Sequence, residues 1–208
     1  MPVLAGSLVS AVLALALFSW LAEEVFEGQT KQFDARMRGF IHQYSSERMT
    51  SVMKFVTLLG SPRVLFSLFI LFSVMFLLAK WKRAAAWLAA GTAGSVVLDF
   101  TLKLLFHRAR PVPFFAPMPK SYSFPSGHAL SSFCFYGILA GLIDTRIHNA
   151  AARLSVWIAA AVLVLLIGVS RIYLGVHYPT DVVAGYCAAA MWVSALVYAD
   201  HAGVRILP

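Results

Sequence analysis

The sequence predicts an all-α, polytopic membrane protein in which six transmembrane helices form one bundle. Of its 208 residues, 60% are hydrophobic and only 12% are charged, and the mean hydropathy is +0.78. A soluble domain has roughly half apolar and about a quarter charged residues. The apolar residues gather in runs close to the length of about 17 to 25 residues that spans a bilayer. We therefore expect a single membrane-embedded domain over residues 1–208.

The expected spans follow one another along the chain, with charged segments between them. They are residues 3–22, 64–79, 84–106, 127–143, 153–170 and 179–199. The first run has no Lys or Arg before it and no clear small-residue cleavage site before Glu23, so we interpret it as a retained helix and not as a cleaved signal. An even number of spans leaves both ends of the chain on the same side of the membrane.

The segment 23–63, between the first two spans, mixes charges with apolar residues at helical spacing. The apolar residues are Phe26, Phe33, Met37, Phe40 and Ile41. This pattern predicts an amphipathic helix on the membrane surface at about 26–48. A solvated helical loop explains the same pattern equally well.

Two other connections are expected to lie on one face of the membrane. Residues 107–125 contain five prolines and cannot be helical throughout, which predicts an ordered loop. Residues 171–178 end at Pro179, where a new helix can begin. Because the spans alternate in direction, these two loops meet at the same end of the bundle.

The first of three polar clusters contains Lys103 and Arg110, which are seven residues apart. Seven residues make two helical turns, so we expect both cations on one side of the third span, which Pro111 ends. A pair of fixed cations suits a dianionic phosphate. Taken alone, the pair is also typical of interfacial cations whose charged ends reach toward water.

The second cluster is Pro125-Ser126-Gly127-His128, directly before the fourth span. Ser126 can cap the helix, and Gly127 lets the backbone approach a ligand, so the helix N-terminus is a candidate anion site. A histidine in the first turn, beside a bound phosphate, is able to protonate a leaving oxygen. The alternative is a capped helix with an interfacial histidine.

The third cluster runs from Ser170 and Arg171 to His177 and Asp181. His177 and Asp181 are four residues apart, close enough for the carboxylate to hold one imidazole N–H and leave the other ring nitrogen as a nucleophile. Arg171 adds a third cation for the phosphoryl oxygens. A purely structural His–Asp pair is the alternative. Polar groups at membrane depth are costly without partners or work, so the three clusters together favour a functional site.

The net charge of +8 does not predict nucleic-acid binding, because no stacking or groove-reading motif accompanies it. Attraction to anionic lipid head groups is the better explanation. No cluster of carboxylates lies near the site, so the sequence does not predict a divalent metal there. Cys134 and Cys187 lie inside apolar runs, and we expect them to serve in packing.

The three clusters resemble the three-part signature of the type-2 phosphatidic acid phosphatase family. The first part matches from Lys103 to Arg110 and Pro111, the second is the Pro-Ser-Gly-His sequence that ends at His128, and the third matches from Ser170 to Asp181. All three parts match without a departure, and the pattern of six spans extends the resemblance over nearly the whole chain. His107 and Arg108 fall at positions that the family leaves variable.

The resemblance implies a role for each residue of the signature. His177 would attack phosphorus, Asp181 would orient it, and His128 would protonate the leaving group. The phosphoryl oxygens would be held by Lys103, Arg110, Arg171, Ser126 and the amide of Gly127. The resemblance also implies that no metal or other cofactor takes part. Outside the signature, Asp99 is expected to form a helical ion pair with Lys103, and Lys120 is either a solvated lysine or a contact to a second phosphate.

The expected position of the site, at the ends of spanning helices where lipid head groups lie, predicts a lipid substrate. The resemblance implies a bacterial inner membrane, with the site on the periplasmic face. Small bacterial lipid phosphatases of this family act on phosphatidylglycerol phosphate, phosphatidic acid or undecaprenyl pyrophosphate. Phe114, Phe115 and Tyr122 are candidates for the border of a lipid entrance. Outside the site and its loop, six Lys and Arg residues would lie on each side of the membrane, so charge does not decide the orientation.

Two other functions compete with this one. A phosphatase of a soluble phosphate ester would use the same constellation. A channel, transporter or catalytically silent lipid-binding protein would use Lys, Arg and helix N-termini to bind an anion. Such a protein would not need His177, Asp181 and His128 together.

Overall fold

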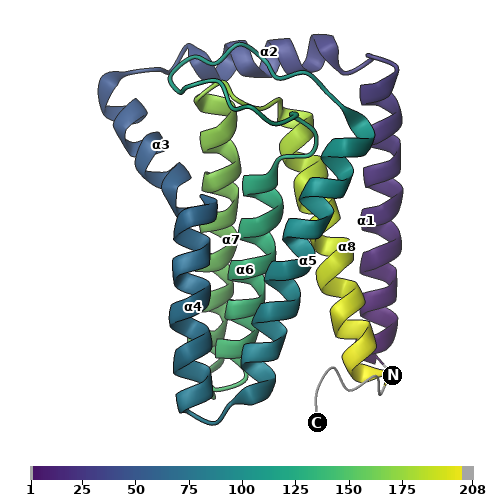
Figure 1. Ribbon diagram of the computed structural model, residues 1–208, viewed down its shortest axis with the longest axis vertical. Helices are drawn as coiled ribbons and strands as arrows, with labels where there is room; N and C mark the ends of the chain where they lie inside the picture. The colour runs from purple at the N-terminus through teal and green to yellow at the C-terminus, as the bar shows by residue number, and fades with distance from the viewer. Residues whose placement is uncertain (1, 203–208) are drawn as a thin grey trace.

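The computed structural model describes residues 2–202, which form eight helices and, within that range, no strand (Figure 1). The helices are α1 (Pro2–Phe26), α2 (Lys31–His42), α3 (Glu47–Leu59), α4 (Pro62–Leu78), α5 (Lys82–Phe106), α6 (Gly127–Asp144), α7 (Ala150–Tyr173) and α8 (Pro179–His201). Helices α1, α4, α5, α6, α7 and α8 run along one bundle, and α2 lies across one end of it (Figure 1). The predicted all-α membrane bundle is therefore confirmed.

Fewer than the six predicted spans are found when each helix is judged separately by its length and apolar composition. Among the described residues, α1, α5, α7 and α8 are long and apolar enough to cross a membrane, and the pair α3 and α4, which meet at 46°, makes a fifth span if counted as one. The remaining predicted span, 127–143, coincides with α6. This helix packs on α5, α7 and α8 and buries both small side chains, such as Ala129 and Ser132, and large apolar ones, such as Phe135 and Ile138. The count of six stays a prediction.

The segment 23–63 contains two helices instead of one. The predicted surface helix at about 26–48 is present as α2 but is shorter. A new helix, α3, begins where the Ser46 side chain accepts a hydrogen bond from the Met49 amide at 3.2 Å. Ser61 starts α4 in the same way, with Pro62 in its first turn, and this second start signal explains the bend. The segment therefore covers the same end of the bundle as the two loops (Figure 1).

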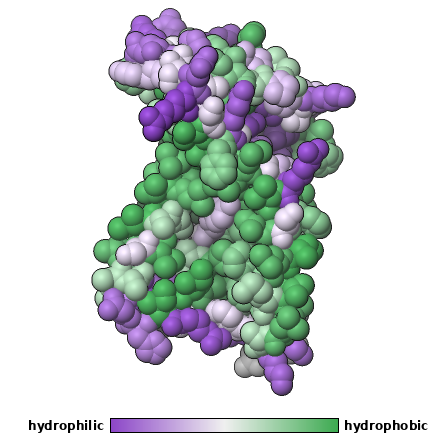
Figure 2. Space-filling model, turned by 90° about the vertical axis from the view of Figure 1, so that its left-hand side faces the viewer, coloured by the Kyte–Doolittle hydropathy of each residue, from purple (hydrophilic) through white to green (hydrophobic). Residues whose placement is uncertain are grey.

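The outer surface of the bundle is apolar over a broad band between two hydrophilic ends (Figure 2). Large side chains in this band are exposed, among them Phe66 and Val97. Apolar patches of this extent are rare on soluble monomers but are expected where helices face lipid. The band places the two loops and α2 together at one interface between membrane and water.

The inner contacts of α8 bring it close to α1 and α6. Cys134 and Cys187 are free thiols buried in the same apolar cluster, which confirms their expected packing role. Gly185 lies so close to the start of α6 that a Cβ atom there would be 2.7 Å from the carbonyl oxygen of Ser126. This approach fixes the start of α6 against the first turn of α8, where Asp181 lies.

Candidate active site

The three polar clusters meet around one cavity of about 640 Å³ at the end of the bundle that carries both loops. The candidate residues that line it are Lys103, Arg110, Gly127, His128, Arg171 and His177. The two other candidates, Ser126 and Asp181, lie behind this lining and are fully buried. The structure thus brings together residues that are more than 70 positions apart in the sequence.

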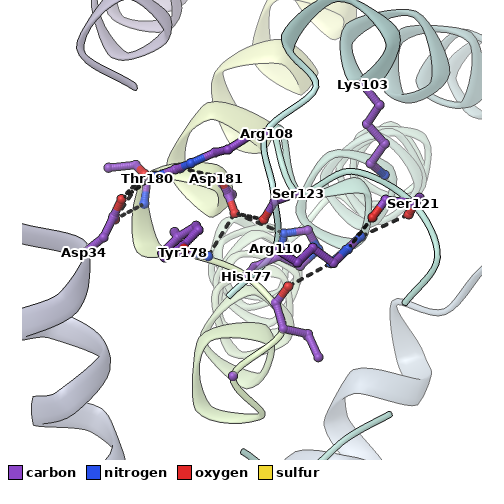
Figure 3. Close-up of polar contacts among 12 residues, drawn as sticks. Asp34, Lys103, Arg108, Arg110, Ser121, Ser123, His177, Tyr178, Thr180 and Asp181 are labelled. Carbon is purple, nitrogen blue, oxygen red and sulfur yellow. Dashed lines mark hydrogen bonds and ion pairs between the residues drawn. The ribbon is translucent and has the colours of Figure 1, made fainter. Parts of the chain in front are cut away.

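His177 and Asp181 form the contact that their spacing predicts. The distance from His177 Nδ1 to Asp181 Oδ2 is 3.3 Å, and both residues are almost completely buried. Asp181 Oδ2 also accepts hydrogen bonds from the Tyr178 amide at 2.9 Å and from Ser123 Oγ (Figure 3). Since an ionised carboxylate only accepts, the proton lies on Nδ1 of His177, and Nε2 keeps its lone pair.

The imidazole of His177 is neutral at physiological pH. Burial lowers the pKa of His177 to about 4, although the hydrogen bond and the charge of Asp181 act in the opposite direction. Arg110 Nη1 lies 2.9 Å from His177 Nε2, and because a guanidinium only donates, Nε2 is the acceptor. An unprotonated Nε2 therefore lies beside a cation at the cavity, which is the arrangement that a nucleophile for phosphorus needs.

The expected placement of Arg110 on a helix with Lys103 is wrong. Helix α5 ends at Phe106, and His107 has the left-handed φ of 45° that ends many helices. Arg110 lies in the loop that follows. It is held there by hydrogen bonds to the Ser121 and Val176 carbonyl oxygens, at 2.6 and 2.7 Å, and to Ser121 Oγ (Figure 3). Arg110 still lines the cavity, but it does so from the loop.

Lys103 forms the predicted ion pair with Asp99, with Nζ–O distances of 2.6 and 2.7 Å. This pair packs tightly against the start of α6. A Cβ atom on Gly127 would be 2.5 Å from Asp99 Oδ1. A glycine is needed at Gly127 because the Asp99 carboxylate lies there, whereas the sequence suggested approach of a ligand.

Ser126 occupies the N-cap position of α6 but does not cap it with its side chain. Its Oγ atom is buried and has no hydrogen-bond partner among the described residues. Buried hydroxyl groups in folded proteins are normally paired. The first turn of α6, which has no side-chain cap, lines the cavity with Gly127 and His128, and the unpaired Ser126 hydroxyl lies buried directly behind them.

Arg171 lies near the end of α7 and is 9% exposed. One of its nitrogens, Nη1, donates to Thr57 Oγ1 on α3 at 2.8 Å, but its Nε has no partner within residues 2–202. A buried guanidinium with an unused N–H is costly unless an anion completes it. Thr57 is a contact that the sequence did not reveal.

The contacts of Arg108 to two carboxylates are a second feature that the sequence did not reveal. Its guanidinium donates to Asp181 Oδ1 at 2.6 Å and to Asp34 Oδ2, on α2, at 2.7 Å (Figure 3). The family signature leaves position 108 variable, and no local sequence pattern connects Arg108 with Asp34.

The candidates for the border of a lipid entrance are not part of the cavity wall itself. The loop residues Phe114, Phe115 and Tyr122 do not line it, and neither does Lys120. Phe114 makes other contacts instead. Its amide donates to the Leu174 carbonyl oxygen at 3.0 Å, and its ring contacts Arg38 and His42. The wall is instead formed by side chains of α4, α5 and α6, which are Leu65, Phe66, Val96 and Phe135.

The charges that face the cavity are mostly positive. In the part of the chain that the structure describes, no three His, Cys, Asp or Glu side chains gather closely enough to hold a metal ion. Lys103, Arg110 and Arg171 instead supply fixed positive charge. Such cations, together with a neutral imidazole, suit the binding and transfer of a phosphoryl group.

An imidazole with an unprotonated Nε2 among fixed cations, at the end of a helical bundle with an apolar belt, suits a membrane phosphatase as the class of protein. The comparison with known sequences gives the family. Residues 84–204 match the PAP2 superfamily, and because this match covers more than half of the chain, the chain belongs to that superfamily. It is a membrane lipid phosphatase.

Relatives with known names and structures cover much of the chain. It is 35% identical over 143 residues to phosphatidylglycerophosphatase B of Bacillus subtilis, which is 66% of this chain and 68% of that protein. It is 32% identical over 108 residues to an undecaprenyl-diphosphatase of Sulfolobus acidocaldarius, which is 49% of this chain and 48% of that protein. The crystal structure of the transmembrane PAP2 type phosphatidylglycerolphosphate phosphatase from Bacillus subtilis is similar at a TM-score of 0.84 and 26% identity, over 94% of this chain and 98% of that one.

Proposed function

We propose that the protein removes phosphate from a membrane lipid through a phosphohistidine intermediate on His177. The observation that supports this most directly is the unprotonated Nε2 of His177, which is fixed by Asp181 on one side and lies beside Arg110 at the cavity. His177 also lines the cavity, so a phosphate bound there would meet Nε2 as soon as Arg110 moves from this nitrogen to the phosphoryl oxygens.

In the first step, His177 Nε2 forms a bond to phosphorus as the bond from phosphorus to the leaving oxygen breaks. Asp181 balances the positive charge that the imidazole gains. His128, also at the cavity wall, gives its proton to the leaving oxygen. Arg110 turns from Nε2 to the phosphoryl oxygens, which Lys103 and Arg171 also contact.

In the second step, water attacks the phosphohistidine and the P–N bond breaks. His128 now takes the proton of that water, inorganic phosphate leaves, and His177 returns to its neutral form. The unpaired Nε of Arg171, the unpaired hydroxyl of Ser126 and the amide of Gly127 hold the phosphoryl oxygens through both steps. All transferred atoms are thereby accounted for by the substrate, water and protein.

The shape of the cavity supports a lipid substrate over a soluble ester. Its polar lining lies at the loop end, and its apolar lining on α4 and α5 includes Leu65, Phe66 and Val96. A lipid would place its phosphate among the cations and its chains along this wall. The named relatives act on phosphatidylglycerol phosphate and on undecaprenyl diphosphate, so we propose a lipid phosphate monoester or diphosphate as substrate.

Phosphate release by the purified protein in mixed micelles tests this function. We expect release from one or more of phosphatidylglycerol phosphate, phosphatidic acid and undecaprenyl diphosphate, at a higher kcat/KM than from a soluble ester such as glycerol phosphate. Because three cations already neutralise the phosphate, release should continue in excess EDTA. Loss of activity in EDTA with rescue by Mg²⁺ would contradict the electrostatics, and preference for the soluble ester would contradict the lipid assignment.

For the orientation, we propose that the site faces the periplasm in the cytoplasmic membrane of a bacterium. Lys120 is exposed in the loop beside the site, and His148 is exposed in the connection from α6 to α7 at the other end of the bundle (Figure 1). In a background without Cys134 and Cys187, Lys120→Cys should react with a membrane-impermeant maleimide in intact spheroplasts, and His148→Cys only after lysis. The reverse pattern would place the site in the cytoplasm.

A further inference from the structure

One guanidinium lies between two buried carboxylates on different helices. Arg108 Nη1 is 2.6 Å from Asp181 Oδ1, and Arg108 Nη2 is 2.7 Å from Asp34 Oδ2 (Figure 3). Both carboxylates are completely buried, and the Arg108 side chain is 13% exposed. Asp34 is the buried residue of α2, the helix that lies across the end of the bundle. The contact therefore joins α2 to the carboxylate that faces His177.

Thr180 adds a second connection between the same two helices. Its amide donates to Asp34 Oδ1 at 3.2 Å, and its hydroxyl lies 2.9 and 3.0 Å from the two Asp34 oxygens. The Thr180 hydroxyl also accepts a hydrogen bond from Arg108 at 2.8 Å. The Arg108 guanidinium lies over the Tyr178 ring at 4.2 Å. On α8 and at its start, these contacts are made by Thr180 and Tyr178, which lie one and three residues before Asp181.

The two oxygens of Asp181 have different partners. Oδ1 accepts from Arg108, whereas Oδ2 accepts from His177, Ser123 and the Tyr178 amide. Arg108 thus fixes the rotation of the carboxylate and leaves Oδ2 to the imidazole. It also neutralises charge, because an isolated buried carboxylate is expensive and two of them without a cation are more so. The planar fork of arginine suits this bridge, and a lysine would not.

We propose that Arg108 is a positioning residue for the phosphatase reaction and that Asp34, from α2, holds Arg108 in place. Arg108 does not line the cavity, so it acts on the reaction through Asp181 and His177 and not through the substrate. Helix α2 is thereby part of the catalytic arrangement and not only a cover at the membrane surface. The inference rests on the proposed role of His177.

Steady-state kinetics of Arg108→Gln separates this role from a general structural one. We expect kcat to fall about 10- to 100-fold, as for other residues that orient a ligating or catalytic side chain, with KM changed less than about twofold. The matched control is Arg36→Gln, an exposed arginine on α2, which should keep the kcat of the unchanged protein. A wild-type kcat in folded Arg108→Gln, or a loss confined to KM, would overturn the proposal.

The double variant Asp34→Asn/Arg108→Gln tests the charge balance. Removing Arg108 alone leaves two facing carboxylates without a cation, whereas the double variant leaves only Asp181 charged. We expect the double variant to regain about threefold in kcat over Arg108→Gln and to stay below the unchanged protein, because the coupling of such neighbours is not additive and Arg108 is still missing. A double variant as slow as or slower than Arg108→Gln would contradict the proposed balance.

If Arg108→Gln does not fold, the double variant is compared with Asp34→Asn. Asp34→Asn keeps Arg108 beside Asp181 but loosens it, so we expect its kcat to lie below that of the unchanged protein and about threefold above that of the double variant at equal KM, and equal kcat in the pair would overturn the role of Arg108. Failure of the proposed function itself is seen differently. If the proposed function is wrong, the unchanged protein forms no phosphohistidine at His177, and this result does not depend on how the Arg108 variants behave.

Discussion

His177→Ala is expected to abolish turnover of every substrate, with kcat reduced by about 10⁵-fold or more, as when the nucleophile of a hydrolase is removed. Without Nε2 no covalent phosphoenzyme forms, and no other histidine replaces it, because Asp181 and Arg110 hold only this imidazole. The measurement is phosphate release from phosphatidic acid and from p-nitrophenyl phosphate by the purified variant.

The matched control for this variant is His148→Ala, which changes an exposed histidine at the opposite end of the bundle. It should retain full activity. Since His177 is 1% exposed, alanine leaves a space, so His177→Asn serves as a second variant of similar size. Substantial turnover by either folded His177 variant would show that another group attacks phosphorus.

His128→Ala is expected to damage the reaction selectively, according to the leaving group. Loss of a general acid costs about 10²- to 10⁴-fold when the leaving oxygen needs a proton, as the alkoxide of phosphatidic acid does. p-Nitrophenolate leaves readily as an anion, so its release should fall by less than about tenfold. The ratio of kcat/KM for the two substrates, in the variant and in the unchanged protein, measures this selectivity.

The same His148→Ala protein is the control, and its ratio of kcat/KM should equal that of the unchanged protein. His128 is predicted to act twice, so impaired water activation should also let phosphohistidine accumulate in His128→Ala. Equal losses on both substrates in a folded variant would mean that His128 does not protonate the leaving group.

Local spacing is what made much of the site predictable. The four-residue spacing of Asp99 and Lys103 corresponds to one turn of α5, the same spacing of His177 and Asp181 crosses the start of α8, and both predicted contacts are present. The alternating direction of the spans correctly predicted that the loops 107–125 and 171–178 lie at the same end of the bundle. These inferences needed only the geometry of a single helix and the thickness of a membrane.

Local spacing also produced the main error. The two-turn distance from Lys103 to Arg110 assumed that α5 continues to Pro111, but the left-handed His107 ends it earlier. A non-glycine residue in that conformation is uncommon and gives no reliable sequence signal. Arg110 reaches the cavity because Ser121 and Val176 hold it.

The contacts made by the segment 23–63 could not have been predicted from one sequence. Asp34 is 74 residues from Arg108, and Thr57 is 114 residues from Arg171. In the sequence, Asp34 is one acid in a mixed-charge segment, and only the docking of α2 makes it a buried partner. Long-range ion pairs depend on how the helices pack, which helical periodicity does not encode.

The most direct test of the account is to locate the phosphate on the enzyme. His128→Ala is incubated with a lipid substrate that carries radiolabelled phosphate, quenched in alkali and digested, and the labelled peptide is identified by mass spectrometry. We expect a phosphoryl group that is stable in alkali and labile in acid on the peptide that contains His177, and no such group in His128→Ala/His177→Ala. Label on a different residue, or turnover by His128→Ala without any labelled peptide, would contradict covalent catalysis by His177.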